Sequence, residues 1–231
     1  MKGFEKMTVR ELIVFLLAAT FAGLMIGIGG TASLLSAVRI GGGFGKFIGG
    51  FIFSLGLYVI LTYEMKLFTG MVPLIPTMGV KNTWRLSVCF VCNAIGVGIV
   101  AWMVSYMPIY TEVSQAGSAL IGAKLDMDTW AMNAILSGVL CGVLITASVW
   151  SLRYAPQKGL STTMGVILPI IVFAFCGFDH SVANMLYFYF LGELSWRVVG
   201  YILLSIVGNV IGGVLFPLVA KLRASETDKT A

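Results

Sequence analysis

The chain has 231 residues, of which 58% are hydrophobic and only 11% are charged. A soluble protein carries roughly 25% charged residues, so this composition excludes a soluble domain, a disordered chain and nucleic-acid binding as the main role. The four cysteines are scattered through apolar runs, which excludes a secreted disulfide scaffold. The formal net charge is +5. The sequence therefore indicates an integral membrane protein.

Six apolar stretches follow one another along the chain, and a membrane span needs about 20 such residues. In chain order they are 12–38, 47–80, 86–111, 129–152, 159–192 and 198–220. The second is interrupted by Glu64 and Lys66, and the fifth by Asp179 and His180. Each of these two stretches has 34 residues, which is too long for one straight span. We therefore predict an all-α membrane protein with six transmembrane helices, of which the second and fifth are broken.

The order full, broken, full occurs twice and predicts two repeats, at about 10–111 and 127–221, within a single transmembrane domain covering 1–231. A polar tail, 222–231, follows them. Trp84-Arg85 and Trp196-Arg197 open the third and sixth spans, and Asn93 and Asn209 occupy matching places inside them. Because each repeat has three spans, the two repeats must insert in opposite orientations, which is a common plan in transport proteins.

The distribution of Lys and Arg predicts the orientation, because cytoplasmic loops carry an excess of both. With the N-terminus inside, the inner loops and ends hold ten and the outer loops hold four. The inner set is Lys2, Lys6, Arg10, Lys81, Arg85, Arg153, Lys158, Lys221, Arg223 and Lys229, and the outer set is Arg39, Lys46, Lys124 and Arg197. We expect a multi-pass protein of the cell (cytoplasmic) membrane with both termini in the cytoplasm. The run after Arg10 is too long for a signal-peptide core, so it is expected to remain as the first span.

The two helix breaks hold the residues that are candidates for chemistry. His180 is the only histidine of the chain. Ionisable groups inside a membrane are functional candidates, and imidazole titrates near neutral pH. In the other break, Thr69 offers a hydroxyl and Phe68 a bulky apolar plug, while Leu57 lies about three turns earlier on the same helix. Glu64 and Lys66 either contribute to the pore or simply pair with each other or reach the interface.

Other kinds of site find no support in the sequence. Cys89 and Cys92 form a C-x-x-C pattern, but it lies within an apolar span and lacks a second ligand pair. No nucleotide-binding or protease motif occurs, and Ser181 is too close in sequence to His180 to act with it as nucleophile and base. We expect no cofactor, no metal site and no enzymatic activity.

Three motifs resemble the formate/nitrite transporter family. Residues 177–185 (GFDHSVANM) are similar to that family's fifth-helix break, G-F-E-H-S-x-A-N-M, and they include Asn184. Residues 67–70 (LFTG) resemble its second-helix loop, and residues 208–213 (GNVIGG) resemble its sixth-helix signature. The motifs occur in the family's order within a matching six-span repeat, so the resemblance covers essentially the whole chain.

The resemblance implies an aquaporin-like protomer with its own pore, assembled as a homopentamer in lipid. It makes His180 the central pore histidine and Thr69 the loop threonine that faces it. Leu57 and Phe68 form one hydrophobic constriction, and either Phe175 or Phe178 contributes to the other. Lys124 resembles the family's vestibule lysine.

The chain departs from the family pattern at three positions. Asp179 replaces the usual glutamate, Gly142 stands where many members have an asparagine, and Lys66 occupies a position that is commonly acidic. The change at Gly142 removes a hydrogen-bond donor that is expected near the histidine. The changes at Gly142 and Lys66 bear on the choice of substrate, because both alter polarity near the pore.

We therefore expect a channel or transporter for small monovalent weak-acid anions, formate first. Lys124, together with Lys66, attracts the anion, and His180 then donates a hydrogen bond or a proton to it with help from Thr69. Alternatives are a nitrite or hydrosulfide channel and a proton-coupled monocarboxylate symporter. An alternative of another class is a membrane scaffold or sensor that transports nothing. The expected partners are the small anion, protons and membrane lipid.

Overall fold

The computed structural model describes residues 7–78, 82–153 and 159–230, and side chains up to residue 222. Helices occupy most of this part of the chain, and it contains no strand. Their order is α1 (Val9–Ile40), α2 (Gly42–Thr62), α3 (Phe68–Met71), η1 (Val72–Thr77), α4 (Trp84–Val104), α5 (Tyr110–Leu125), α6 (Trp130–Arg153), α7 (Leu160–Cys176), α8 (Ser181–Leu191) and α9 (Trp196–Thr230).

Six membrane spans are confirmed, of which the fifth is visibly broken. Five helices, α1, α2, α4, α6 and α9, are long and apolar enough to cross a bilayer individually. The remaining span, the fifth in chain order, is the pair α7 and α8, which bends by 40° at the break between Cys176 and Ser181. The second span is broken as well, because α2 ends at Thr62 and the chain turns through residues 63–67 into the short helix α3.

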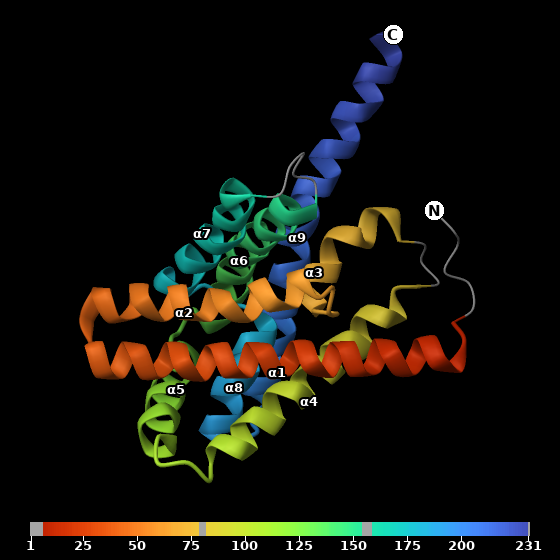
Figure 1. The fold of residues 1–231 in the computed structure, drawn as a ribbon. Coiled ribbons are helices and arrows are strands. Elements are labelled where there is room, and N and C mark those ends of the chain that lie inside the picture. The colour runs from red at the N-terminus through yellow and green to blue at the C-terminus, as the bar shows by residue number, and fades with distance from the viewer. Residues whose placement is uncertain (1–6, 79–81, 154–158, 231) are drawn as a thin grey trace.

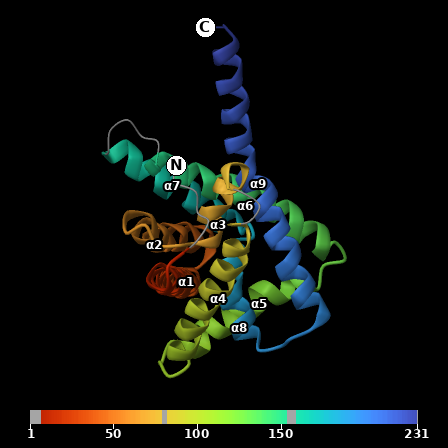
Figure 2. The same ribbon diagram turned by 90° about the vertical axis from the view of Figure 1, so that its right-hand side faces the viewer.

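The repeats appear as two similar groups of packed helices. In the first group α1 packs against α2 and α4, and in the second α6 packs against α7 and α9 (Figure 1). The short helix α3 lies in the middle of the body, against α4, α6, α8 and α9 (Figure 2). Trp84 and Trp196 begin α4 and α9, as predicted, and the guanidinium of the following arginine lies over each indole ring, at 5.8 and 5.7 Å from its centroid.

Glycines let the helices of each group approach closely. A Cβ atom on Gly96 of α4 would collide with the backbone of α1 at Thr20. A Cβ atom on Gly212 of α9 would likewise collide with the backbone of α6 at Val139. Lipid supplies no hydrophobic force between helices, so close contact through small residues holds such a bundle together.

The structure differs from the sequence prediction around the middle of the chain. The third span ends at Val104 rather than near residue 111, and a separate helix, α5, follows it. Helix α5 was not predicted because Thr111, Glu112 and Ser114 in its first turns make it too polar for a membrane span. The polar tail continues α9 as a helix to Thr230. Residues 79 and 80 of the second apolar stretch, and Lys2, Lys6, Lys81 and Lys158 of the inner set, lie outside the described residues.

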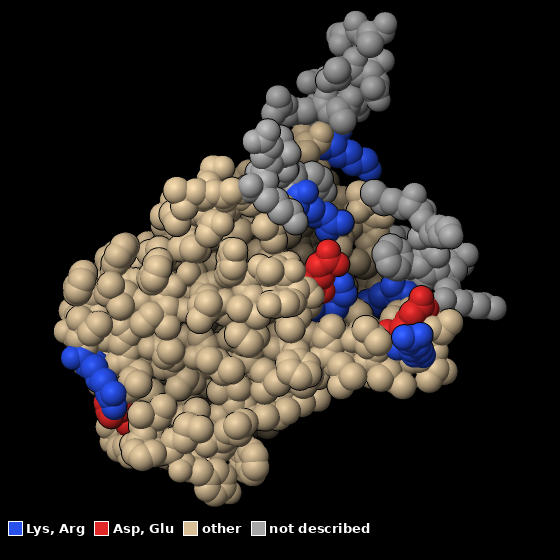
Figure 3. All heavy atoms as spheres, viewed as in Figure 1, with Lys and Arg blue, Asp and Glu red and all other residues tan. Residues whose placement is uncertain are grey.

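Charge is distributed as expected for a membrane protein. The face in Figure 3 is largely uncharged, and its Lys, Arg, Asp and Glu side chains gather at opposite ends of the body. Six crossings return the chain to the side on which it starts. In Figure 1 the first turn of α1 lies on the right and the last turns of α9 extend to the upper right, both away from the α1–α2 turn on the left.

Candidate functional site

The two helix breaks meet at a buried pair of polar side chains. The hydroxyl of Thr69, in α3, lies 2.8 Å from Nε2 of His180, which immediately precedes α8. Both residues are almost completely buried, with 3% and 1% of their surface exposed. The predicted meeting of Thr69 and His180 is therefore present in the structure.

The hydrogen bonds of His180 define its neutral tautomer. Its Nδ1 accepts a hydrogen bond from the backbone N–H of Ala183 at 3.0 Å, so that the ring caps the N-terminus of α8. A nitrogen that accepts carries no hydrogen, so the hydrogen of the neutral ring is on Nε2. His180 therefore donates from Nε2 to Thr69, and the Thr69 hydroxyl keeps its own hydrogen to donate.

Asn93 of α4 holds the first break in place. Its Oδ1 accepts from the backbone N–H of Phe68 at 2.8 Å, and its Nδ2 donates to the carbonyls of Lys66 at 2.9 Å and Ala19 at 2.7 Å. Non-helical backbone survives at membrane depth only if its polar groups find partners inside the protein. The Asn93 amide supplies these partners.

Asn209 of α9 holds the second break by the same pattern. Its Oδ1 accepts from the backbone N–H of Ser181 at 2.8 Å, and its Nδ2 donates to the carbonyls of Asp179 at 2.7 Å and Gly138 at 2.9 Å. In each repeat the asparagine amide thus bonds to the backbone of two break residues that are two positions apart, and to a carbonyl in the first helix of that repeat. This correspondence makes Leu67 the residue of the first repeat that is equivalent to His180 in the second. Thr69 forms a hydrogen bond with His180 but is not its equivalent in the repeat.

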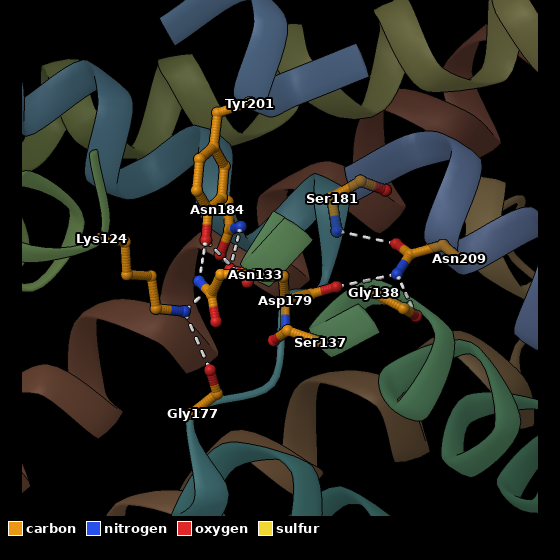
Figure 4. Close-up of polar contacts among 10 residues, drawn as sticks. All are labelled: Lys124, Asn133, Ser137, Gly138, Gly177, Asp179, Ser181, Asn184, Tyr201 and Asn209. Carbon is orange, nitrogen blue, oxygen red and sulfur yellow. Dashed lines mark hydrogen bonds and ion pairs between the residues drawn. The ribbon is translucent and has the colours of Figure 1, made fainter. Parts of the chain in front are cut away.

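Asp179 anchors the second break to the surrounding helices (Figure 4). It is fully buried, and its carboxylate accepts hydrogen bonds from Lys124 and Asn184 at 2.7 Å each and from the hydroxyl of Tyr201 at 2.8 Å. Its backbone N–H donates to Ser137 at 2.9 Å. Helices α5, α6, α8 and α9 therefore all contact this one residue, which keeps the neighbouring His180 in position.

Lys124 is part of this network rather than a free cation. Besides Asp179, its ammonium group donates to the carbonyl of Gly177 at 2.8 Å (Figure 4). Only 17% of its side chain is exposed. Gly177 ends α7 with φ at 72°, a left-handed conformation that favours glycine. The ion pair between Lys124 and Asp179 was not predicted, because α5 and the break are more than 50 residues apart in sequence.

A pocket of about 160 Å³ leads to the histidine from one side of the protein. We call it the vestibule pocket. It is lined by Ser33, Leu34, Ala37, Lys46, Phe53, Leu120, Lys124, Phe173, Ala174, Phe175, Cys176, Gly177, Phe178, His180, Ala183, Asn184 and Tyr187. Four of the predicted pore residues, Lys124, Phe175, Phe178 and Asn184, therefore line the same pocket as His180.

An aromatic pair that was not predicted lies in this pocket beside His180. The rings of Phe53 and Phe173 meet edge to face, with centroids 5.6 Å apart, and Phe173 stacks on the imidazole at 5.8 Å. Phe175 and Phe178, the two predicted candidates, also line the pocket, but Phe175 is 45% exposed. Phe53 precedes the predicted pore residue Leu57 by one turn of α2, so helical spacing could have pointed to it. Phe173 lies before the break that separates α7 from His180, so no helical spacing relates these two residues.

The remaining predicted pore residues lie outside the vestibule pocket. Leu57 and Phe68 belong to the buried hydrophobic core, with 1% and 4% of their surface exposed. Lys66 lies in the first break, where its carbonyl is bonded to Asn93 and also accepts from the thiol of Cys89 at 3.2 Å. Glu64, two residues earlier in the same break, has φ at 53°, a left-handed conformation that is uncommon for residues other than glycine.

Gly142 takes part in helix packing. A Cβ atom at this position would lie 2.5 Å from the backbone oxygen of Asn209, so the close contact between α6 and α9 leaves no room for an asparagine side chain.

Among the described residues, no group of three or more His, Cys, Asp or Glu side chains is arranged to hold a metal ion.

These features define a membrane transport protein: two broken helices of opposite orientation meet at a buried polar pair, with a pocket leading to it. The family model described as "Formate/nitrite transporter" matches residues 2–222. The chain therefore belongs to the formate/nitrite transporter family.

Known relatives are similar over most of the chain. The "Uncharacterized transporter YrhG" of Bacillus subtilis (strain 168) is 29% identical over 76% of this chain and 70% of its own length. The "Probable formate transporter" of Methanothermobacter thermautotrophicus is 28% identical over 92% of this chain and 88% of its own. A solved structure titled "Pentameric formate channel with formate bound" superposes with a TM-score of 0.79 at 21% identity, over 95% of this chain and 99% of that one, and is similar in fold.

Proposed function

We propose that this protein is a channel or transporter for small monovalent weak-acid anions, with formate as its first substrate and nitrite and hydrosulfide as further members of the class. The observation that carries the proposal is the His180–Thr69 pair, buried where two helix breaks meet at the vestibule pocket. Membership of the formate/nitrite transporter family and the relative named as a probable formate transporter support the same substrate class. We place the protein in the cell membrane with both termini in the cytoplasm.

The proposed path crosses two apolar constrictions. Phe53 and Phe173 line the vestibule pocket together with His180, and Leu57 and Phe68 lie in the buried core. A bare anion loses its hydration in such a constriction, which is very costly. A weak acid with pKa near ~4 can instead cross in its neutral form, at about 4 kcal/mol for protonation at pH 7.

In the proposed mechanism His180 assists the anion by hydrogen bonding. The Nε2–H of the ring is bonded to the Thr69 hydroxyl, so the passing anion takes over this donor from Thr69, and the hydroxyl beside it offers a second donor. If His180 gave away the Nε2 hydrogen as a proton, Nδ1 would have to take up another to avoid an anionic ring, and Nδ1 is already bonded to the N–H of Ala183. Hydrogen-bond donation by the neutral ring is therefore the role that we propose, with the proton of the weak acid supplied by water.

Formate flux in proteoliposomes tests this function. With purified protein, we expect uptake of formate, nitrite and hydrosulfide, slower uptake of acetate and lactate, and faster flux at pH 5 than at pH 7 because more of each acid is neutral. Liposomes without protein correct for passive leakage of the neutral acids. The absence of any anion-dependent flux would instead favour the scaffold or sensor alternative. Flux that drives protons uphill would identify a symporter.

The assembly gives a separate prediction. Following the pentameric structure to which the fold is similar, we expect a homopentamer of about 124 kDa, five times the 24.8 kDa chain. Native mass spectrometry from detergent measures this mass directly. A monomer or dimer that persists when lipid is retained would contradict the pentamer, without bearing on whether each protomer has a pore.

A further inference from the structure

The vestibule pocket has two basic side chains on its wall. Among the described residues that line it, Lys46 of α2 and Lys124 of α5 are charged, and no carboxylate belongs to the lining. Apolar walls concentrate the field of such charges into the pocket, so a net positive charge there raises the local concentration of an anion. The attraction therefore depends on which lysine has an uncompensated charge.

The charge of Lys124 is balanced. Its ammonium nitrogen is 2.7 Å from Oδ1 of Asp179, and the carboxylate is completely buried behind it. Seen from the pocket, this pair is a dipole with no net charge, and its attraction for an anion falls off faster with distance than that of a single charge.

Lys46 has no such partner. Its side chain is exposed, and it makes no hydrogen bond or ion pair with any described residue. The neighbouring cation at this end, Arg39 in the last turn of α1, forms an ion pair with Glu112 at 3.0 Å. Hydrogen bonds from Arg39 also hold the pKa of Glu112 below its ordinary value, so the carboxylate stays charged and that pair stays neutral.

We propose that Lys46 is the cation that recruits anions into the vestibule pocket, while Lys124 mainly fixes the break through Asp179 and Gly177. This inference rests on the proposed transport function and adds to it the residue that concentrates the substrate. It predicts that Lys46 acts at a distance through its charge and is therefore replaceable by arginine. It also predicts that Lys46 affects the substrate concentration needed for half-maximal flux rather than the maximal flux.

Cys176 provides a probe of the local potential that needs no transport. It lines the vestibule pocket and is exposed, whereas Cys89, Cys92 and Cys141 are buried. An anionic thiol reagent, sulfonatoethyl methanethiosulfonate, and a cationic one, trimethylammonioethyl methanethiosulfonate, would be compared on the full chain in detergent. A positive pocket speeds the first reagent and slows the second.

The expected result is a change in the ratio of the two labelling rates. For Lys46→Gln at low salt, the anionic reagent should react about threefold more slowly and the cationic reagent about threefold faster. The ratio of the anionic to the cationic labelling rate should therefore fall by about tenfold. This effect should shrink at higher salt, which screens the charge over ~8–10 Å. Lys46→Arg should keep the wild-type ratio. Lys221→Gln, a charge removal on the far part of α9, is the matched control and should leave the ratio unchanged. Cys176→Ser should abolish labelling.

An unchanged ratio in Lys46→Gln, at low salt, would overturn the proposal. So would an equal fall in Lys46→Arg, since that would show a role for shape rather than charge. Formate flux gives the second readout: Lys46→Gln should raise the half-saturating formate concentration about threefold at low salt and leave maximal flux within error. If wild-type protein carries no anion at all, the proposed function fails, and the labelling ratio still decides whether Lys46 sets the potential.

Discussion

Replacing His180 with leucine is expected to lower formate flux by about tenfold to a hundredfold. The imidazole is the buried donor at the meeting point of the two breaks, and a hydrogen bond to a charged group is worth about 1.5–3 kcal/mol. Leucine also removes the cap that Nδ1 provides to α8, which costs about 1 kcal/mol of stability. Flux per pentamer in proteoliposomes measures the loss, and the unfolding midpoint in detergent shows how much of it is structural.

A second substitution separates hydrogen-bond donation from proton supply. His180→Asn retains an oxygen that can cap α8 and an amide that can donate toward Thr69, but it cannot titrate between pH 5 and 8. If the neutral ring only donates a hydrogen bond, flux should stay within a few-fold of wild type and its dependence on pH should be unchanged. A loss as large as that of His180→Leu, with a flattened pH profile, would assign proton supply to His180 instead.

Asn93 and Asn209, whose side-chain amides hold the two breaks, are called here the amide clamps. Replacing either of them with leucine should both destabilise the protein and stop transport. Asn93→Leu removes three hydrogen bonds and leaves the buried N–H of Phe68 without its partner. The carbonyl of Lys66 keeps its bond from Cys89, and that of Ala19 lies within α1, where it accepts a helical bond. The unsatisfied N–H costs about 1–3 kcal/mol and each of the two other lost bonds about 0.5–1.5 kcal/mol, so we expect a loss of about 3 kcal/mol. By the scaling for soluble domains of this size, that loss lowers the unfolding midpoint by about 6–12 °C.

The second repeat provides an internal comparison for the Asn93→Leu experiment. Asn209→Leu removes three equivalent hydrogen bonds in the second repeat, so it should cost about as much as Asn93→Leu. Ser151→Ala is a suitable control, because Ser151 bonds only to a carbonyl of its own helix, Ala147, and its loss should shift the midpoint little. An Asn93→Leu protein with wild-type stability and flux would show that the first break holds its shape without the clamp.

The sequence predicted those features that depend on local composition. Each span has to place about 20 apolar residues in lipid, so the six stretches and the two interruptions can be read directly from the chain. The matching Asn93 and Asn209 identified the repeat, and the motifs around Thr69 and His180 identified the pair that the structure brings together. Helix α5 was missed for the same physical reason, because its polar first turns carry no apolar signal.

The partners of each polar group were decided only by the tertiary structure. Asp179 is joined to Lys124 and Tyr201, and the phenylalanine facing Phe173 is Phe53, on a different helix far away in sequence. Hydropathy determines which residues enter the membrane, but it contains no information on how the helices rotate about their axes. That rotation is set by close contacts, such as that of Gly96 in α4 with α1 and that of Gly142 in α6 with α9, which fix the helix faces that meet. The sequence alone therefore determined the spans and the breaks, and its resemblance to the family implied the His180–Thr69 pair, whereas helix packing decided that Lys124 is balanced and Lys46 is not.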